Sequence, residues 1–273
     1  MTKHFPIFFF LFSLAACGHS STLLQGADNT PVVDNSISSS KTDWQKLRNL
    51  AAANANTNPQ TQPTLTPVNT FQAFPESDPD NLLDAFIQTF VLFAPGPGSR
   101  FGQDSMETWL LGPPYGGGFY IQSGDVVSLG NGGEIILGFP RYFPVNGSGP
   151  DFIIFENAFQ PRGSTSLFAE PAIVSVSQDG INFISFPCNL NPPYDGCAGT
   201  HAVYANPDLN DLNPRDPATA GGDAFDLAEV GLRYIQFIKI KDSNLKLAGD
   251  GAVQTGQAGF DLDAIAIVHG AKP

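Results

Sequence analysis

The segment GPDFIIFENAF, residues 149–159, decides the fold class, because it places a short apolar run between turn-forming and polar residues. The run from Phe152 to Phe155 holds only aromatic and β-branched residues, which favour an extended strand. Asp151 opens the run, and Glu156 and Asn157 close it. We therefore predict a strand that carries acidic and amide side chains at its ends.

Similar runs recur along the chain, separated by Gly, Pro and Asn rather than by helical segments. They are DVVSL, GEIILGF, PAIVSVSQDG, NFISF, RYIQFIKIKD and DLDAIAIV. Strands that do not alternate with helices predict an all-β, antiparallel β-sandwich. Residues 178–181 (QDGI) predict a hairpin turn. The segment DNLLDAFIQTFVLF, residues 80–93, has helix-like apolar spacing, although its end prefers strand.

The N-terminus predicts export and a lipid anchor. Residues 1–16 contain an apolar run that is shorter than the roughly 20 residues of a membrane span and fits a signal peptide. Leu14 to Cys17 resembles the lipobox of bacterial lipoproteins, in which the cysteine is acylated after cleavage. Gly18 after this cysteine resembles the sorting pattern of the outer membrane. We expect an outer-membrane lipoprotein of a Gram-negative-type bacterium, exposed at the cell surface.

Residues 17–70 are rich in Ser, Thr, Asn, Gln and Pro and predict a disordered tether, with at most a short helix starting at Thr42. Residues 71–273 then form the predicted sandwich domain. The chain has 23 Phe residues, enough apolar content for a sizeable core.

The charge balance limits the classes of partner. Lys and Arg number 13 against 26 Asp and Glu, a net charge of −13. Such a chain should be repelled by nucleic acid and by anionic lipid headgroups, whereas divalent cations should be attracted.

Two cysteines remain after the lipidated one. Cys188 and Cys197 lie in one Pro-rich loop, PCNLNPPYDGC, and an exported compartment permits disulfides. We predict that they pair, since the loop offers too few further ligands for a thiol metal site.

Several segments together resemble a family of bacterial cell-surface proteins with a galactose-binding-like, jelly-roll domain. They are SLGNGGEIILGF, GPDFIIFENAF, VSVSQDGINF, AGGDAFDLAEVGLRYIQFIKI and FDLDAIAI, within roughly residues 85–270. The closing strand also resembles carbohydrate-binding modules of that fold, which often hold a structural calcium. The resemblance implies a binding or surface-display role without naming a ligand.

Acidic residues gather at the ends of the predicted strands and around the turn AGGDAFDL, residues 220–227. Calcium takes six to eight oxygen ligands from carboxylates, amides and backbone carbonyls, and adjacent glycines allow a sharp turn. We predict a structural calcium site; solvated turn residues are the alternative reading for each acid. The candidate ligands are Glu156, Asn157, Asp223 and Asp226, with Asp216, Asp261 and Asp263 in addition.

Loop aromatics are the candidates for a ligand surface, because aromatic faces stack on sugars and other planar ligands. The residues are Tyr115, Trp109, Arg141 and Tyr142. The sequence lacks GxSxG, HExxH and P-loop spacings, so we expect no enzyme. We predict a lipid-anchored binding module for a glycan, host matrix or small nutrient. The alternatives are a structural envelope protein and, with less support, a glycan-processing hydrolase.

Overall fold

The computed structural model describes residues 74–248, 252–255 and 259–273. The predicted signal peptide, Cys17, the whole predicted tether and the short helix expected from Thr42 lie outside these residues. No helix in the described part of the chain is long and apolar enough to cross a bilayer.

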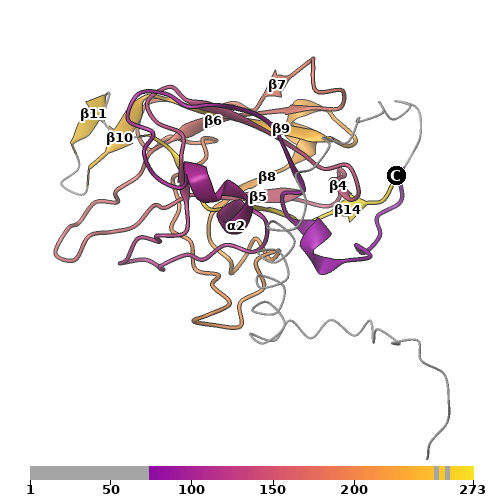
Figure 1. Cartoon of the computed structure of the whole chain (residues 1–273), viewed down its shortest axis with the longest axis horizontal. Helices are drawn as coiled ribbons and strands as arrows, with labels where there is room; N and C mark the ends of the chain where they lie inside the picture. The colour runs from indigo at the N-terminus through magenta and orange to yellow at the C-terminus, as the bar shows by residue number, and fades with distance from the viewer. Residues whose placement is uncertain (1–73, 249–251, 256–258) are drawn as a thin grey trace, which may run out of the picture. The chain divides into compact units, whose positions relative to one another are not determined.

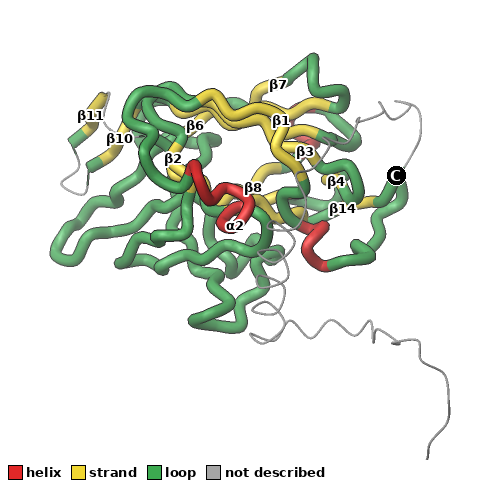
Figure 2. Tube along the Cα trace, viewed as in Figure 1, coloured by secondary structure: helices red, strands yellow, loops and turns green. Residues whose placement is uncertain are grey.

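The described residues are mostly strands and loops, with one short α-helix (Figure 2). The helical elements are η1 (Leu82–Ala85), η2 (Gln103–Ser105), α2 (Met106–Leu110) and η3 (Leu227–Val230). The strands are β1 (Thr89–Ala94), β2 (Val127–Ser128), β3 (Glu134–Gly138), β4 (Phe143–Pro144), β5 (Phe152–Phe155), β6 (Ala172–Ser177), β7 (Ile184–Ser185), β8 (Asp223–Phe225), β9 (Phe237–Asp242), β10 (Leu245–Leu247), β11 (Val253–Thr255), β12 (Asp261–Leu262), β13 (Ala264–Ile267) and β14 (Gly270–Ala271).

Antiparallel sheets form two layers, as the sequence predicts for a sandwich. A five-stranded sheet has the order β1-β3-β9-β6-β7, and a three-stranded sheet has the order β13-β5-β8. The first crosses the top of the view in Figure 1, and β5 and β8 lie beneath it. Three two-stranded pairs, β12-β2, β14-β4 and β10-β11, complete the pairing among the described strands.

Side-chain alternation explains how the larger sheet covers the core. In β9, Ile238 and Ile240 are fully buried. The alternate residues point the other way: Lys239 is partly exposed and Lys241 is exposed. All four residues of β5 are buried, because this strand is central in its sheet and covered on both faces. A strand buried on both faces reads as a continuous apolar run, which is what FIIF shows.

Residues 80–93 do not form the helix that their first apolar residues suggest. The chain makes a single 3₁₀ turn, η1, whose cap Asn81 accepts a hydrogen bond from the Leu83 N–H, and then enters β1. The strand preference of the second half of the segment is confirmed, because Thr89 to Ala94 pair with β3. The hairpin turn predicted at residues 178–181 is also confirmed, since it joins β6 to β7.

The predicted disulfide is confirmed: Cys188 and Cys197 are bonded, with their Cα atoms 4.6 Å apart. The closed loop lies beside the start of β6, where Ala172 and Ala198 exchange backbone hydrogen bonds. The disulfide therefore fixes a loop that is already tied to the larger sheet.

Removing this disulfide by the double change Cys188→Ser and Cys197→Ser should lower the free energy of unfolding. Closing a loop of about ten residues restricts the unfolded chain by roughly 2.5 to 3 kcal/mol in the chain-entropy model. Urea unfolding of the variant and of the oxidised wild type measures the difference. Equal midpoints and slopes would contradict the stabilising role.

Candidate functional site

Four acidic residues stand where the chain leaves and re-enters the sheets. Glu156 directly follows β5 and Glu170 shortly precedes β6, so they bracket the loop between these strands. Asp242 ends β9 and Asp261 begins β12, so they bracket the excursion that contains β10 and β11. The start of β6 pairs with the end of β9, at Ala172 and Asp242. We call these four residues the acidic cluster.

Two members of the acidic cluster are buried without adequate hydrogen bonding. Glu156 and Glu170 are each 1% exposed. Three of their oxygens have no hydrogen-bond partner among the described residues: both carboxyl oxygens of Glu156 and Oε1 of Glu170. An unpaired charge away from water costs several kcal/mol, so a buried carboxylate normally meets donors or a cation. These oxygens are the strongest sign of a missing partner in the described structure.

Burial and mutual repulsion both favour the protonated forms of these acids. Burial raises the pKa of Glu156 well above its usual range, and the negative charge of Glu170 adds to the effect. The N–H of Asp261 lies close enough to lower this pKa, but outside hydrogen-bonding geometry. Burial also raises the pKa of Glu170 to about 8, with the charge of Asp261 as the second cause.

Asp261 is partly exposed to solvent, whereas Glu156 and Glu170 are buried. Burial raises its pKa to about 6, and the nearby side chains of Ser128, Lys246 and Asn157 work in the opposite direction. Lys246 of β10 is the nearest cation, with its Nζ 3.9 Å from Oε1 of Glu170 and 4.5 Å from the centre of the Phe168 ring. This long contact leaves most of the negative charge of the cluster without a counter-charge.

In calcium-free buffer, the free energy of unfolding should fall as pH rises from about 5 to about 8. The folded pKa values of Glu170 and Asp261 lie above their unfolded values, so the folded state keeps protons that the unfolded state has released. Stability is therefore greatest at low pH and is lost through the folded pKa values, by an amount on the order of 3 kcal/mol. Urea unfolding in EDTA across this range measures it, and a flat profile would contradict the shifts.

The other predicted metal ligands have hydrogen-bond partners outside this cluster, although the charge of Asp223 still contributes to the raised pKa of Glu156. Asp223 is buried and accepts hydrogen bonds from the Gly199 and Thr200 N–H groups, at 2.7 and 3.0 Å, and from the Thr200 hydroxyl. Its Oδ1 also lies 2.7 Å from Nδ1 of His201, and this contact raises the His201 pKa. The carboxylate of Asp223 thus fastens the 199–201 turn to β8.

Asp226, Asp216 and Asp263 have local structural roles. Asp226 caps η3 by accepting from the Ala228 N–H, and Asp216 accepts from the Ala218 N–H within its own turn. Asp263 is fully buried, and both its oxygens lie within 3.1 Å of the Tyr115 nitrogen. Of the predicted set, Glu156, Asn157 and Asp261 come together, and Asp223 lies near enough to act on Glu156 while bonded to its own turn.

Replacing Asp223 with Ala should destabilise the fold by about 2 to 4 kcal/mol, because buried backbone donors lose their acceptor. Asp223→Asn should cost less, since it keeps one acceptor oxygen. Chemical unfolding of both variants, each with calcium and with EDTA, makes the comparison. Because the role is a backbone clasp, the loss should be the same in both buffers; a loss seen only with calcium would instead make Asp223 a ligand.

The predicted ligand aromatics are mostly part of the core. Tyr115 is 6% exposed and Tyr142 is 1% exposed. Trp109 is partly buried and its ring stacks on Phe101, 5.3 Å between centroids. Arg141 is exposed but engaged by Asp84, at 2.7 Å. None of these four residues lines the surface hollow beside the β6–β7 hairpin.

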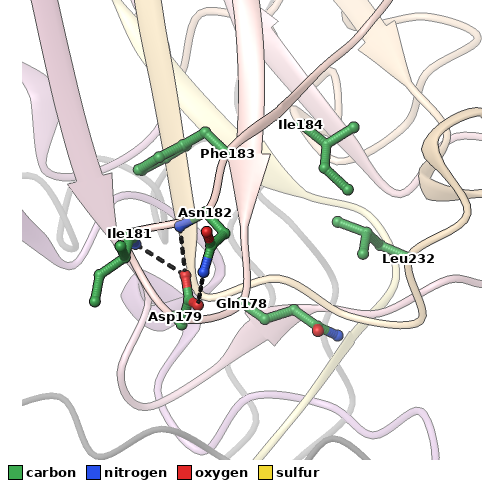
Figure 3. A pocket seen from close by; sticks show the side chains of 7 residues that line it. All are labelled: Gln178, Asp179, Ile181, Asn182, Phe183, Ile184 and Leu232. Carbon is green, nitrogen blue, oxygen red and sulfur yellow. Dashed lines mark hydrogen bonds between the residues drawn. The ribbon is translucent and has the colours of Figure 1, made fainter.

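A shallow hollow of about 440 Å³ lies instead beside the β6–β7 hairpin (Figure 3). It is lined by Gln178, Asp179, Ile181, Asn182, Phe183, Ile184 and Leu232. Asp179 is its only titratable lining residue, and this carboxylate accepts from the Ile181 and Asn182 N–H groups, which lowers its pKa. The acid therefore stiffens the hairpin and does not point to chemistry in the hollow.

Sequence reasoning missed Glu170, Asp242 and Lys246 as parts of the site. A signal for the acids existed in the order of the strands. One acid stands where a strand ends, and a second acid stands where a later strand begins. The connection between the two strands leaves from the first acid and returns to the second, so both acids lie at its base. Lys246 lies within a short hairpin and carried no comparable signal.

Among the described residues, no group of three or more His, Cys, Asp and Glu side chains is arranged so that it could hold a metal ion. A cation at the acidic cluster would need amide, hydroxyl or backbone oxygens as well. Comparison with known proteins adds no further assignment: no family model matches the chain, and no curated protein matches it.

Proposed function

We propose that this chain is a lipid-anchored, cell-surface binding module whose sandwich domain is stabilised by calcium at the acidic cluster. The single observation that supports it is the set of unpaired, buried oxygens on Glu156 and Glu170. The finer fold assignment, a galactose-binding-like jelly roll, is part of the same proposal and rests on the resemblance of the sequence segments.

The chemistry of the donors fits calcium. Glu156 and Glu170 carry buried carboxylate oxygens that accept no hydrogen bond, and the Asn157 amide and the Asp261 carboxylate lie near them. Calcium accepts such mixed oxygen sets with flexible geometry, and backbone carbonyls complete them. When bound, the ion would neutralise the buried charges and draw the ends of two long connections together.

The predicted compartment also supports calcium. A lipoprotein signal ending at Cys17 would place the domain outside the cytoplasm, where calcium fills even weak sites with dissociation constants of roughly 10⁻⁴ to 10⁻³ M. The net charge of −13 adds a general attraction for divalent cations. We propose binding rather than catalysis, with a glycan, a matrix protein or a small nutrient as the ligand class.

Calcium should raise the melting temperature of the full-length chain at pH 7.5 relative to EDTA. A hundredfold excess over the dissociation constant adds about 2.7 kcal/mol to the folded state. Glu156→Gln should melt higher than wild type in EDTA, because it removes a buried acid without a partner, and should lose the calcium increment. Differential scanning calorimetry measures both.

The matched control is Glu229→Gln, which changes an exposed acid of η3 and should keep the full calcium increment. Identical wild-type midpoints with calcium and with EDTA would reject the cation site. If calcium still raises the melting temperature of Glu156→Gln as much as that of wild type, the ion binds at a site other than the acidic cluster.

A further inference from the structure

We infer that Phe119, Tyr120 and Ile121 form a binding surface for neutral saccharides, and that the acidic cluster holds this surface in position through Asn157. The link to the cluster rests on the proposed function; the surface itself rests on separate observations. We call these three residues the aromatic corner.

The aromatic corner consists of three consecutive apolar residues that the fold leaves exposed, two of which have their rings in contact. Phe119, Tyr120 and Ile121 are 37%, 56% and 58% exposed. Exposed apolar side chains scattered singly are ordinary, but a contiguous group marks an interaction site. The two rings lie at 85° with centroids 5.0 Å apart, so they present two faces at nearly a right angle.

The backbone of the aromatic corner is fixed before any ligand binds. Gly117 packs so closely on the Ile121 carbonyl that a Cβ would lie 2.0 Å from its oxygen, and Gly118 has φ +78°. The Gly118 N–H donates to Val203 O at 3.0 Å, and the Gln160 N–H donates to Phe119 O at 2.7 Å. A surface ordered in advance loses less entropy on binding.

Asn157 connects the aromatic corner to the acidic cluster. Its Oδ1 accepts from the Ser123 N–H at 2.6 Å, and its Nδ2 donates to the Ser123 carbonyl at 3.1 Å. Asn157 follows Glu156 in the chain, and its side chain lies close enough to Asp261 to lower the pKa of that carboxyl. A cation that orders Glu156 and Asp261 would therefore order the residue that anchors the end of the turn.

The local chemistry favours a neutral saccharide over other ligands. The stretch YGGGFYIQSG, residues 115–124, contains no charged residue, so a charged partner finds no counter-charge in it. The net charge of −13 opposes acidic polysaccharides and anionic lipid surfaces. Aromatic faces stack on the C–H faces of sugar rings, and the exposed amide of Gln122 can hydrogen-bond with hydroxyl groups.

The test is binding of the labelled full-length chain to a printed array of neutral and sialylated glycans in calcium buffer. At least one group of neutral glycans should bind, and Tyr120→Ala should weaken that binding at least tenfold without changing the melting temperature. Phe101→Ala is the matched control, because it removes a ring that is 47% exposed in a different turn. Its binding should equal that of wild type.

Each other outcome overturns a stated part of the inference. If the chain binds only sialylated glycans, the neutral-saccharide surface is overturned. It is also overturned if wild type binds no glycan more strongly than Tyr120→Ala does. If calcium raises the melting temperature in the same sample, such a blank array leaves the cation site of the proposed function standing. Binding that is weaker in EDTA supports the link through Asn157, and equal binding in EDTA overturns that link.

Discussion

A carboxylate that leaves water must meet donors, and this requirement organises the protein. Long loops join short strands, and buried Asp side chains fasten these loops by accepting backbone N–H groups from distant segments. Asp151 accepts from Gly147 and Leu227, each at 2.7 Å. Asp223, Asp242 and Asp263 do the same for other loops. The loops of the sandwich thus depend on charge-assisted hydrogen bonds as much as on apolar packing.

Glu156 and Glu170 break this pattern, and the contrast locates the candidate site. They are as deeply buried as the fastening Asp residues, yet they lack the donors that the others have. An acid without donors in a protein interior is a strain on the fold unless a proton or a cation compensates it. The same reasoning that explains the structural acids therefore separates the functional candidates from them.

The sequence was informative about strands and less informative about which acids meet. Runs such as FIIF and FIKIKD predicted β5 and β9, because apolar patterning reports burial directly. The two cysteines were close enough in one loop for their pairing to follow. The partners of Asp223 could not be read in the same way, because two of its donors are backbone N–H groups of a turn more than twenty residues earlier. Backbone donors carry no residue identity, so no pattern in the sequence reports them.

Tyr115 shows the same limit for aromatic residues. Its place in a Gly- and Pro-rich loop suggested exposure, but its backbone is held by Asp263 and its ring is buried. Four residues later, Phe119 lies in water. Local composition was the same for both, and tertiary contacts alone decided between them.

Asp242 joins the two ends of the excursion between β9 and β12. Its Oδ2 accepts from the Asn244 N–H at the departure, and its Oδ1 accepts from the Phe260 N–H at the return. The two ends are therefore joined whatever lies between them. Lengthening a loop whose ends are already joined costs little, about 0.6 kcal/mol per doubling. Residues inserted into this excursion, such as an epitope tag, should therefore disturb the sandwich little, provided that they leave Lys246 and Leu247 beside Glu170 and Ala169.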